Sequence, residues 1–256
     1  MEDIKVSIIT VCYNSEKTIE RTIKSVLDQT YKRIEYLIID GASTDDTLII
    51  IDKYKDTFGD RLKVVSEKDE GIYYAMNKGI GLATGELIGI INSDDWYEQD
   101  AVENIVKAYE ENHNNPCTIY YGKTGMICDG KLLRIEQPSH EELEEEMISH
   151  PSCFVTAKTY KEYGVFDTKY TSVADYDLML RYIRSNKVSF IPVDKHIANF
   201  ALGGMSSTGK AYIDLLMLKM NYGKISRLKG NVEILKARLA IFMEKRGKEP
   251  IQIRKS

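Results

Sequence analysis

The sequence has 256 residues, which is enough for one α/β domain with a helical tail but too short for two full-sized enzyme domains. Hydrophobic residues make up 43% of the chain and charged residues 29%, so neither a disordered nor a fibrous chain fits. The net charge of −4 gives no general reason to expect a nucleic-acid-binding protein, but the charge is unevenly placed. From Lys219 onward there are eleven Lys or Arg against three Asp or Glu.

The cysteines and the apolar runs bear on the compartment. Cys12, Cys117, Cys128 and Cys153 show no CxxC or Cys/His spacing, so we expect small buried thiols in a reducing compartment, with no disulfide framework or structural zinc. No apolar run approaches about 18 residues and the first residues are acidic, so the sequence predicts neither a membrane span nor a signal peptide. We therefore expect a cytoplasmic protein.

The first half of the chain alternates short apolar runs with stretches of helical period. Strands are predicted at Val6–Val11, Tyr36–Ile39, Leu62–Val65 and Leu87–Ile91. Helices are predicted between them, one following Ser15 and one around Ile72–Ile80. This order is typical of a doubly wound α/β sheet, in which ligands bind outside the carboxyl ends of the strands.

The second half has a less regular pattern that predicts mixed strand directions. A hairpin is predicted around Asp129-Gly130, between Thr118–Tyr121 and Lys131–Glu136, and the run Glu141–Glu146 is interpreted as a solvated helix face. Two further strands and one helix follow, at Cys153–Thr156, Val188–Ile191 and Tyr176–Arg184.

The segment from Lys210 to about Arg246 is helical in period, with breaks expected near Gly223 and Gly230. We divide the chain into a catalytic domain of residues 1–208, with halves 1–112 and 113–208, and a basic C-terminal helical extension of residues 209–256. Three interpretations of the extension stay open: solvated helices packed on the core, peripheral docking on anionic lipid at the inner face of a membrane, and homodimerisation.

The run Asn92-Ser93-Asp94-Asp95-Trp96 directly follows a predicted strand. Adjacent carboxylates at such a place can hold a hard divalent cation and leave positions for phosphate oxygens. The same pair can also cap the following helix. Asp40 follows another predicted strand, where a carboxylate can accept from a nucleobase or a ribose.

Six ordered blocks carry a resemblance to a known family. They are Ser-Ile-Ile-Thr-Val-Cys-Tyr-Asn (7–14), Ser-Val-Leu-Asp-Gln-Thr-Tyr (25–31), Ile-Ile-Asp-Gly-Ala-Ser-Thr-Asp (38–45), Asp-Glu-Gly-Ile-Tyr-Tyr-Ala-Met-Asn-Lys-Gly (69–79), Ala-Thr-Gly-Glu (83–86) and Asn-Ser-Asp-Asp (92–95). The set resembles family 2 glycosyltransferases over roughly residues 4–205, and most of all bacterial enzymes that build capsular polysaccharide, exopolysaccharide or O-antigen units. The resemblance implies a GT-A fold: a doubly wound central mixed β-sheet flanked by helices.

The resemblance also implies the nucleotide-sugar site. Thr10, Val11 and Tyr13 are expected to line the nucleotide, Asp40 to bind uracil or another base, and Asp69 to contact base or ribose. Asn92, Ser93 and Asp94 form the DXD-type motif. The resemblance implies that Asp94 would be the main metal ligand, with Asp95 beside it, and that the metal would be Mn²⁺ or Mg²⁺.

The block Ala-Asp-Tyr-Asp (174–177) resembles the family's Glu-Asp-x-Asp block, which implies that Asp175 is the general base of an inverting transfer and takes the proton of the acceptor hydroxyl. His150 and Trp96 are expected near the acceptor. Gly203, Gly204 and Ser206 are expected in a mobile loop over the donor diphosphate. Three positions depart from the family pattern: Asn92 replaces the first Asp of the motif, Met76 stands where many relatives have Arg, and Ala174 replaces a Glu.

The sequence thus predicts an inverting, metal-assisted glycosyltransferase. It would move a hexose or N-acetylhexosamine from a UDP-sugar to a hydroxyl of a bacterial surface glycan. If the basic extension docks on lipid, this acceptor glycan would be lipid-linked. Two alternatives are a catalytically silent sugar-nucleotide or glycan-binding module, motivated by the three departures, and a sugar-phosphate nucleotidyltransferase, for which the glycine-rich phosphate loop is missing. A dinucleotide-dependent oxidoreductase is excluded by the lack of GxGxxG, and no nucleic-acid partner is expected.

Overall fold

The computed structural model describes residues 4–112, 114–203 and 209–244. The strands are β1 (Val6–Cys12), β2 (Ile34–Asp40), β3 (Leu62–Ser66), β4 (Leu87–Ile90), β5 (Trp96–Tyr97), β6 (Thr118–Cys128), β7 (Lys131–Glu136), β8 (Cys153–Thr156) and β9 (Ser189–Ala201). The helices are α1 (Ile19–Leu27), α2 (Thr47–Asp52), α3 (Lys55–Phe58), α4 (Ile72–Leu82), α5 (Ala101–Glu111), α6 (Ala157–Tyr163), α7 (Ala174–Ser185), α8 (Gly209–Asn221) and α9 (Arg227–Glu244).

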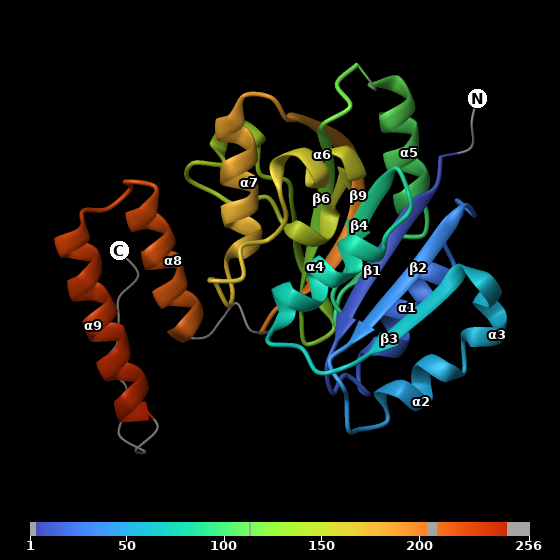
Figure 1. Cartoon of the computed structure of the whole chain (residues 1–256), viewed down its shortest axis with the longest axis horizontal. Coiled ribbons are helices and arrows are strands. Elements are labelled where there is room, and N and C mark those ends of the chain that lie inside the picture. The colour runs from blue at the N-terminus through green and yellow to red at the C-terminus, as the bar shows by residue number, and fades with distance from the viewer. Residues whose placement is uncertain (1–3, 113, 204–208, 245–256) are drawn as a thin grey trace.

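All nine strands join one mixed sheet, so the predicted fold class is confirmed. The order is β3-β2-β1-β4-β8-β6-β9-β5, with β7 paired to β6. β3, β2, β1 and β4 run parallel, β8 is antiparallel to both β4 and β6, and β6 is parallel to β9. Because β4 pairs directly with β8, the sheet continues without interruption from the first half of the chain into the second (Figure 1).

Three of the parallel strands, β1, β2 and β4, are buried on both faces, which explains their largely apolar sequences, whereas the edge strand β3 is partly exposed. In β1, Ile9 and Val11 pack in a cluster with α4 and α7, whereas Val6 and Ile8 pack in a second cluster with α1 and α5. Successive side chains of a strand point to opposite faces, so one apolar run supplies both layers. The helices in Figure 1 accordingly lie on both sides of the sheet.

The amino-terminal edge of the parallel strands is fixed by polar contacts. Glu35 accepts hydrogen bonds from Ser7 Oγ, Thr84 N and Thr84 Oγ1, and pairs with Lys5 Nζ at 2.8 Å. A Cβ on Gly85 would lie 2.6 Å from the Lys5 carbonyl oxygen, so only glycine fits there. The block Ala-Thr-Gly-Glu therefore has a structural role, on the opposite edge from the strands' carboxyl ends.

Two sequence predictions are wrong in the second half, and two strands, β6 and β9, are longer than predicted. Glu141–Glu146 is not a helix: a single 3₁₀ turn at His140–Glu142 is followed by irregular chain, and Glu144 pairs with Arg184 and Lys224. Gly230 does not break α9. It lies inside the helix, where a Cβ would meet Met220 Sδ at 2.2 Å, so this glycine lets α8 and α9 approach closely. β9 continues ten residues past the predicted end at Ile191, because it pairs along β6.

The predicted hairpin around Asp129-Gly130 is present, but its first arm is Thr124–Cys128, whereas Ile119–Tyr121, within the predicted arm, pairs with β8. The chain breaks between α8 and α9 at Gly223, where φ is +72°. α8 begins at Gly209 and forms a helical hairpin with α9 beside α7 (Figure 1). All four cysteines are free, and three of them are buried. None of the helices in the described ranges is both long enough and apolar enough to span a bilayer.

Candidate active site

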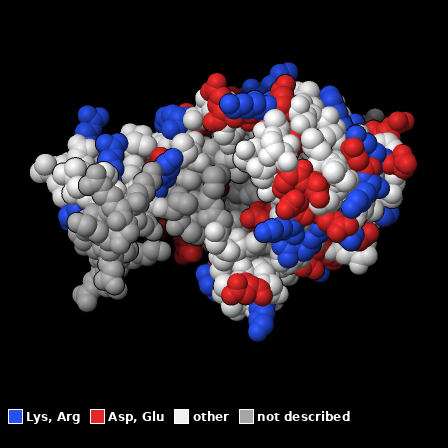
Figure 2. Space-filling model, turned by 90° about the horizontal axis from the view of Figure 1, so that it is seen from below, with Lys and Arg blue, Asp and Glu red and all other residues white. Residues whose placement is uncertain are grey.

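Loops from three of the parallel strands, β1, β2 and β4, meet at the carboxyl edge of the sheet and are tied to one another. After β1 and β2, Ser43 Oγ accepts from Asn14 N at 2.8 Å and Asn14 Oδ1 accepts from Thr44 N at 2.9 Å. The loop after β4 joins them through Ser93, whose hydroxyl lies 2.8 Å from that of Ser15. Figure 2 views this edge from below and shows a hollow near its centre.

The three residues expected to line the nucleotide differ in exposure. Thr10 is buried, and its hydroxyl accepts a hydrogen bond from Tyr36 OH at 3.0 Å. Val11 is buried in the core, whereas Tyr13 is 63% exposed just past the end of β1. Of the three side chains, only that of Tyr13 offers a broad surface to a ligand.

Asp40 is the last residue of β2 and is fully buried. Its carboxylate accepts from Ser43 N at 3.0 Å, Ser43 Oγ at 2.5 Å and Ser66 Oγ at 2.6 Å, and Cys12 Sγ lies 3.6 Å away. A carboxylate has about four acceptor positions. A nucleobase donor would therefore replace one of these internal partners.

Asp69 has an acceptor atom that the described protein groups leave unused. Its Oδ1 pairs with Lys78 Nζ at 2.6 Å, and Lys78 also pairs with Glu67 at 2.7 Å. Its Oδ2 is buried and has no hydrogen-bond partner among the described residues. Since buried acceptors are normally paired, this oxygen is suited to a donor supplied by a ligand, such as a base N–H or a ribose hydroxyl.

Asp94 and Asp95 lie side by side at the end of β4 but play different parts. Asp95 is fully buried, accepting from Ala201 N at 2.8 Å and Asn92 Nδ2 at 3.4 Å. Burial, together with the adjacent Asp94, raises the pKa of Asp95 well above its ordinary value. Asp94 is half-buried, and within the described ranges no other residue donates a hydrogen bond to its carboxylate. Burial raises the pKa of Asp94 too, and Arg21 opposes that shift. Asp95 thus holds the loop to β9, and Asp94 is the carboxylate available to a ligand.

The donor set fits a cation held mainly by substrate. The described residues contain no cluster of three or more His, Cys, Asp or Glu placed to hold a metal. They do offer the Asp94 carboxylate and the buried Asn92 Oδ1, which has no partner in the part of the chain that is described. Mg²⁺ is usually held by one or two carboxylates, phosphate oxygens and water. The site suits such an ion when a diphosphate is present.

Arg21 is a site residue that the sequence analysis missed. It extends from α1 to donate to the Asp94 carbonyl oxygen at 2.8 Å, and its guanidinium lies 3.6 Å from the centre of the Trp96 ring. Trp96, expected near the acceptor, therefore has one face covered by a cation. No pattern distinguishes Arg21 from other exposed cations of an amphipathic helix, so only the tertiary structure reveals it.

Asp175 lies in the first turn of α7, and a residue of α4 holds it. Its Oδ1 accepts from Tyr73 OH at 3.1 Å and from Tyr176 N at 3.0 Å. Burial raises the pKa of Asp175 to about 6, while these two donors lower it. A general base works best with a pKa near the working pH, so this environment suits proton abstraction. Tyr73, within one of the quoted blocks, was not singled out from the sequence.

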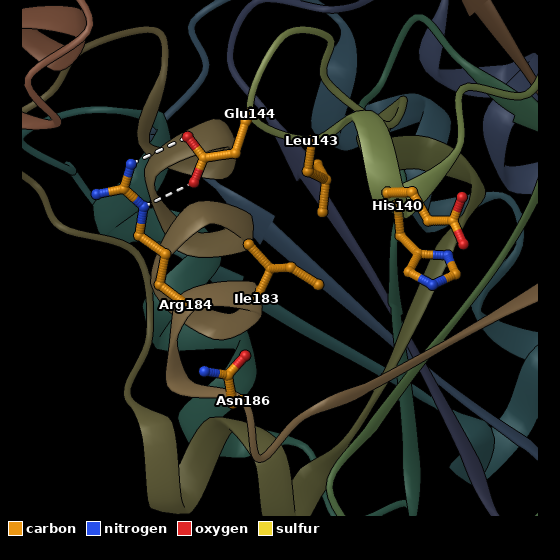
Figure 3. A pocket seen from close by; sticks show the side chains of 7 residues that line it. His140, Leu143, Glu144, Ile183, Arg184 and Asn186 are labelled. Carbon is orange, nitrogen blue, oxygen red and sulfur yellow. Dashed lines mark hydrogen bonds and ion pairs between the residues drawn. The ribbon is translucent and has the colours of Figure 1, made fainter.

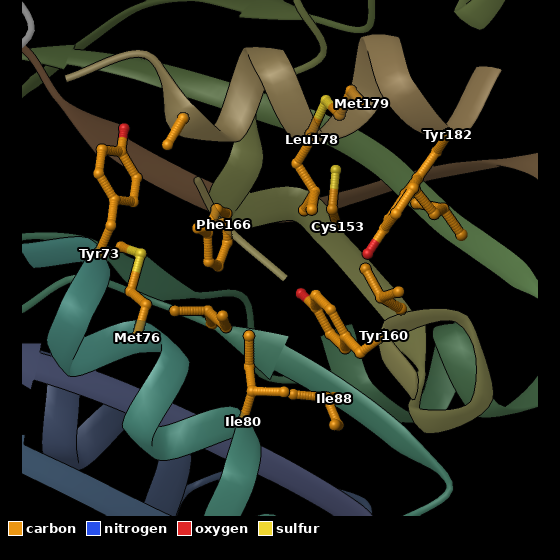
Figure 4. Packing of buried hydrophobic residues seen from close by; sticks show 14 of the residues in the cluster. Tyr73, Met76, Ile80, Ile88, Cys153, Tyr160, Phe166, Leu178, Met179 and Tyr182 are labelled. Carbon is orange, nitrogen blue, oxygen red and sulfur yellow. The ribbon is translucent and has the colours of Figure 1, made fainter. Parts of the chain in front are cut away.

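Met76 and Ala174, two positions that depart from the family pattern, are both buried. Met76 lies one turn after Tyr73 and packs in the apolar cluster between α4 and α7, close to Phe166 and Ile80 (Figure 4). A diphosphate therefore receives no cation from this position. Arg21 is the cation that the structure places beside Asp94.

The remaining acceptor and loop candidates are only partly described. His150 is buried against Phe166, with ring centres 5.9 Å apart, and burial lowers its pKa to about 4, so the ring is neutral near pH 7. Gly203 is exposed with φ of +102°, two residues after the Ala201 amide that binds Asp95. Gly204 and Ser206 lie outside the described residues.

A surface depression of about 420 Å³ is lined by other residues (Figure 3). Residues from the 140–144 turn and the end of α7 line it, and Arg184 binds both oxygens of Glu144, at 2.8 and 3.0 Å. The ion pair neutralises the carboxylate of Glu144, and none of the predicted site residues lines the depression. The hollow at the strand ends remains the better candidate for chemistry.

Comparison with known proteins gives a family match and several relatives. Residues 7–163 match the model of the family described as Glycosyl transferase family 2. Chondroitin synthase of Escherichia coli is 33% identical over 75% of this chain, and hyaluronan synthase of Pasteurella multocida is 31% identical over 80%. The chain spans only 27% and 21% of these two relatives.

Solved structures share the fold. Staphylococcus aureus TarS 1-349 in complex with UDP-GlcNAc superposes with a TM-score of 0.69 at 19% identity, over 91% of this chain and 72% of that one. The mannosyltransferase PcManGT of Pyrobaculum calidifontis, in complex with GDP-Man and Mn²⁺, gives 0.65 at 19% identity, over 93% and 70%. These likenesses confirm the expected GT-A fold.

Proposed function

The chain belongs to glycosyl transferase family 2, and from that premise we propose that it is an inverting glycosyltransferase with a UDP-sugar donor. The donated sugar is a hexose or N-acetylhexosamine, and the acceptor is a hydroxyl of a bacterial surface glycan. The observation that carries the proposal is the Asp175 carboxylate, held by Tyr73 with a pKa of about 6. The names of the relatives, two of them polysaccharide synthases, support a glycan acceptor.

In the proposed reaction, Asp175 takes the proton of the acceptor hydroxyl while that oxygen forms a bond to the anomeric carbon. The bond from this carbon to the diphosphate oxygen breaks on the opposite side, and the electron pair leaves with the nucleoside diphosphate. Tyr73 OH and Tyr176 N hold one oxygen of Asp175, so the other is left for the acceptor. Mn²⁺ or Mg²⁺ held by Asp94 would supply positive charge for the leaving diphosphate.

Donor binding is assigned to groups on the carboxyl edge of β1, β2, β3 and β4. Asp69 Oδ2 and Asn92 Oδ1 are buried acceptors awaiting donors, and Tyr13 is the exposed ring at the end of β1. Arg21 adds positive charge beside Asp94. Asp40 would bind the base after its contact with Ser43 or Ser66 opens.

The test is nucleotide release from a panel of UDP- and GDP-sugars, with Mn²⁺ or with a chelator. We expect release from one UDP-sugar, dependent on metal and lost in Asp94→Asn, whereas Asp100→Asn, an exposed change on the same segment, keeps it. Asp175→Asn should bind UDP and lose transfer, with Asp167→Asn as its matched control.

A catalytically silent binding module stays the alternative, favoured by the buried Met76 and Ala174 where the family pattern has charged residues. Tight UDP binding without release from any donor, in the presence of glycan acceptors, would support that alternative and refute the transferase.

A further inference from the structure

Helix α9 has a packing side made of small residues. Ala237 and Ala240 are buried, and the close approach at Gly230 sets α9 directly against Met220 of α8. Gly209 makes a similar contact near the start of α8, where a Cβ would lie 2.8 Å from Ile241. These contacts fix which side of α9 faces the protein and which side faces outward.

The outward side carries an exposed apolar stripe. Leu228, Val232, Leu235 and Leu239 are 80%, 45%, 60% and 51% exposed. Their spacings of four, three and four residues place them on one face, and at 100° per residue that face lies about 180° from Ala237. The stripe is about 16 Å long at 1.5 Å per residue. Scattered single leucines on a surface need no explanation, but an aligned row of four indicates a contact surface.

Positive side chains border the stripe on both sides. By the same helical geometry, Lys229 and Lys236 flank one border, and Arg227 and Arg238 flank the other. Glu233 is the one acidic residue between Arg227 and Phe242, and it pairs with Lys236 at 2.8 Å. At the left of Figure 2, the described part of α8 and α9 shows Lys and Arg among uncharged residues, whereas the surface over the sheet shows both charges mixed. In the sequence, residues 245–256 add five Lys or Arg and one Glu.

This pattern distinguishes between two occupants of the stripe. If two copies of the chain paired through this stripe, the residues that border it on one α9 would face the same residues on the other α9. Here those residues are cations, which repel one another. An anionic lipid surface offers the opposite charge, and the long stems of Lys and Arg can keep their charged ends at the headgroups while the leucines enter the acyl boundary.

We propose that α9 docks this face on anionic lipid, with Leu228, Val232, Leu235 and Leu239 inserted at the interface. α8 connects the docked helix to the candidate base. Asp214 of α8 accepts from Thr171 N at 2.6 Å and from Ser172 N at 3.1 Å, immediately before the start of α7. Docking through α9 therefore holds the acceptor side of the protein close to the lipid surface. The lipid contact itself does not depend on the proposed transfer activity.

The test is flotation of the full chain with two kinds of vesicle, pure phosphatidylcholine and phosphatidylcholine with about one-third phosphatidylglycerol. We expect binding to the phosphatidylglycerol vesicles only, weakened by added salt. Leu235→Glu with Leu239→Glu should weaken this binding at least about tenfold. The matched control, Leu132→Glu with Leu133→Glu on β7, makes the same change at side chains 52% and 56% exposed and should bind like the wild type.

A second variant protects the test against misfolding of the first. Lys229→Gln with Arg238→Gln leaves the stripe and the packing side unchanged, and should also weaken binding about tenfold. Equal binding to both vesicles, no binding, or full binding by either α9 variant would overturn the proposal. So would a wild-type oligomer in light scattering that Leu235→Glu with Leu239→Glu converts to a monomer, because the stripe would then join copies of the chain.

Discussion

Removing the hydroxyl that holds Asp175 tests the assignment of the base. In Tyr73→Phe the carboxylate loses a donor at 3.1 Å and keeps Tyr176 N at 3.0 Å. Hydrogen bonds to charged groups contribute about 1.5–3 kcal/mol, and about 1.4 kcal/mol corresponds to one pKa unit. The pKa of Asp175 should therefore rise from about 6 by about one to two units.

The assay is the pH dependence of kcat/KM for nucleotide release, from about pH 5 to about pH 9. A base must be ionised to act, so the rate falls as the pH falls through its pKa. The acidic limb of the profile should move to higher pH in Tyr73→Phe, with little change on the plateau above both pKa values. Tyr74→Phe, at the exposed neighbouring ring, should leave the limb in place. An unmoved limb in Tyr73→Phe, or one displaced to lower pH, would refute the reasoning.

Three further predictions concern stability and positioning. Burial raises the pKa of Asp175 from 3.8 to about 6, so the stability that the protonated carboxyl contributes is present at low pH and is lost as the pH rises through about 6. Asp175→Asn carries no such charge. Its free energy of unfolding in urea should therefore exceed that of the wild type by about 1–3 kcal/mol at pH 8 and equal it near pH 4. Asp95→Ala should lower the free energy of unfolding by about 1–3 kcal/mol in thermal melting, because the Ala201 amide loses its acceptor. A loss of metal dependence without destabilisation would contradict the structural role given to Asp95. Asp214→Ala frees the segment at Thr171 that leads into α7, so kcat should fall about tenfold while the Kd for UDP in calorimetry stays unchanged; a weakened Kd would contradict this separation.

The family blocks mark residues of two kinds, and only the structure separates them. Asp94 and Asp69 lie at the carboxyl edge, where Asp69 Oδ2 has no hydrogen-bond partner among the described residues, whereas Gly85 and Thr84 lie at the amino edge and serve packing. Gln29, inside another block, accepts from Val102 N and donates to the Ser25 and Glu98 carbonyl oxygens. Sequence alone shows that such residues recur in a pattern but not what they contact.

The sequence by itself determined the four parallel strands of the sheet and the helices α1 and α4 between them, and it predicted that ligand groups gather at the carboxyl edge of those strands. It could do so because a strand buried on both faces needs an uninterrupted apolar run, and because the carboxyl ends of parallel strands share one edge. These are local properties that a short stretch of chain carries within itself.

Only the tertiary structure decided which groups meet across distance. Tyr73 reaches Asp175 from 102 positions away, and Arg21 reaches Asp94 from 73. The charge run at Glu141–Glu146 predicted a solvated helix face. In the structure Glu144 forms ion pairs with Arg184 and Lys224, and these pairs take the place of the contacts of a regular helix. A pair's partner depends on how the elements pack, and no local periodicity encodes that choice.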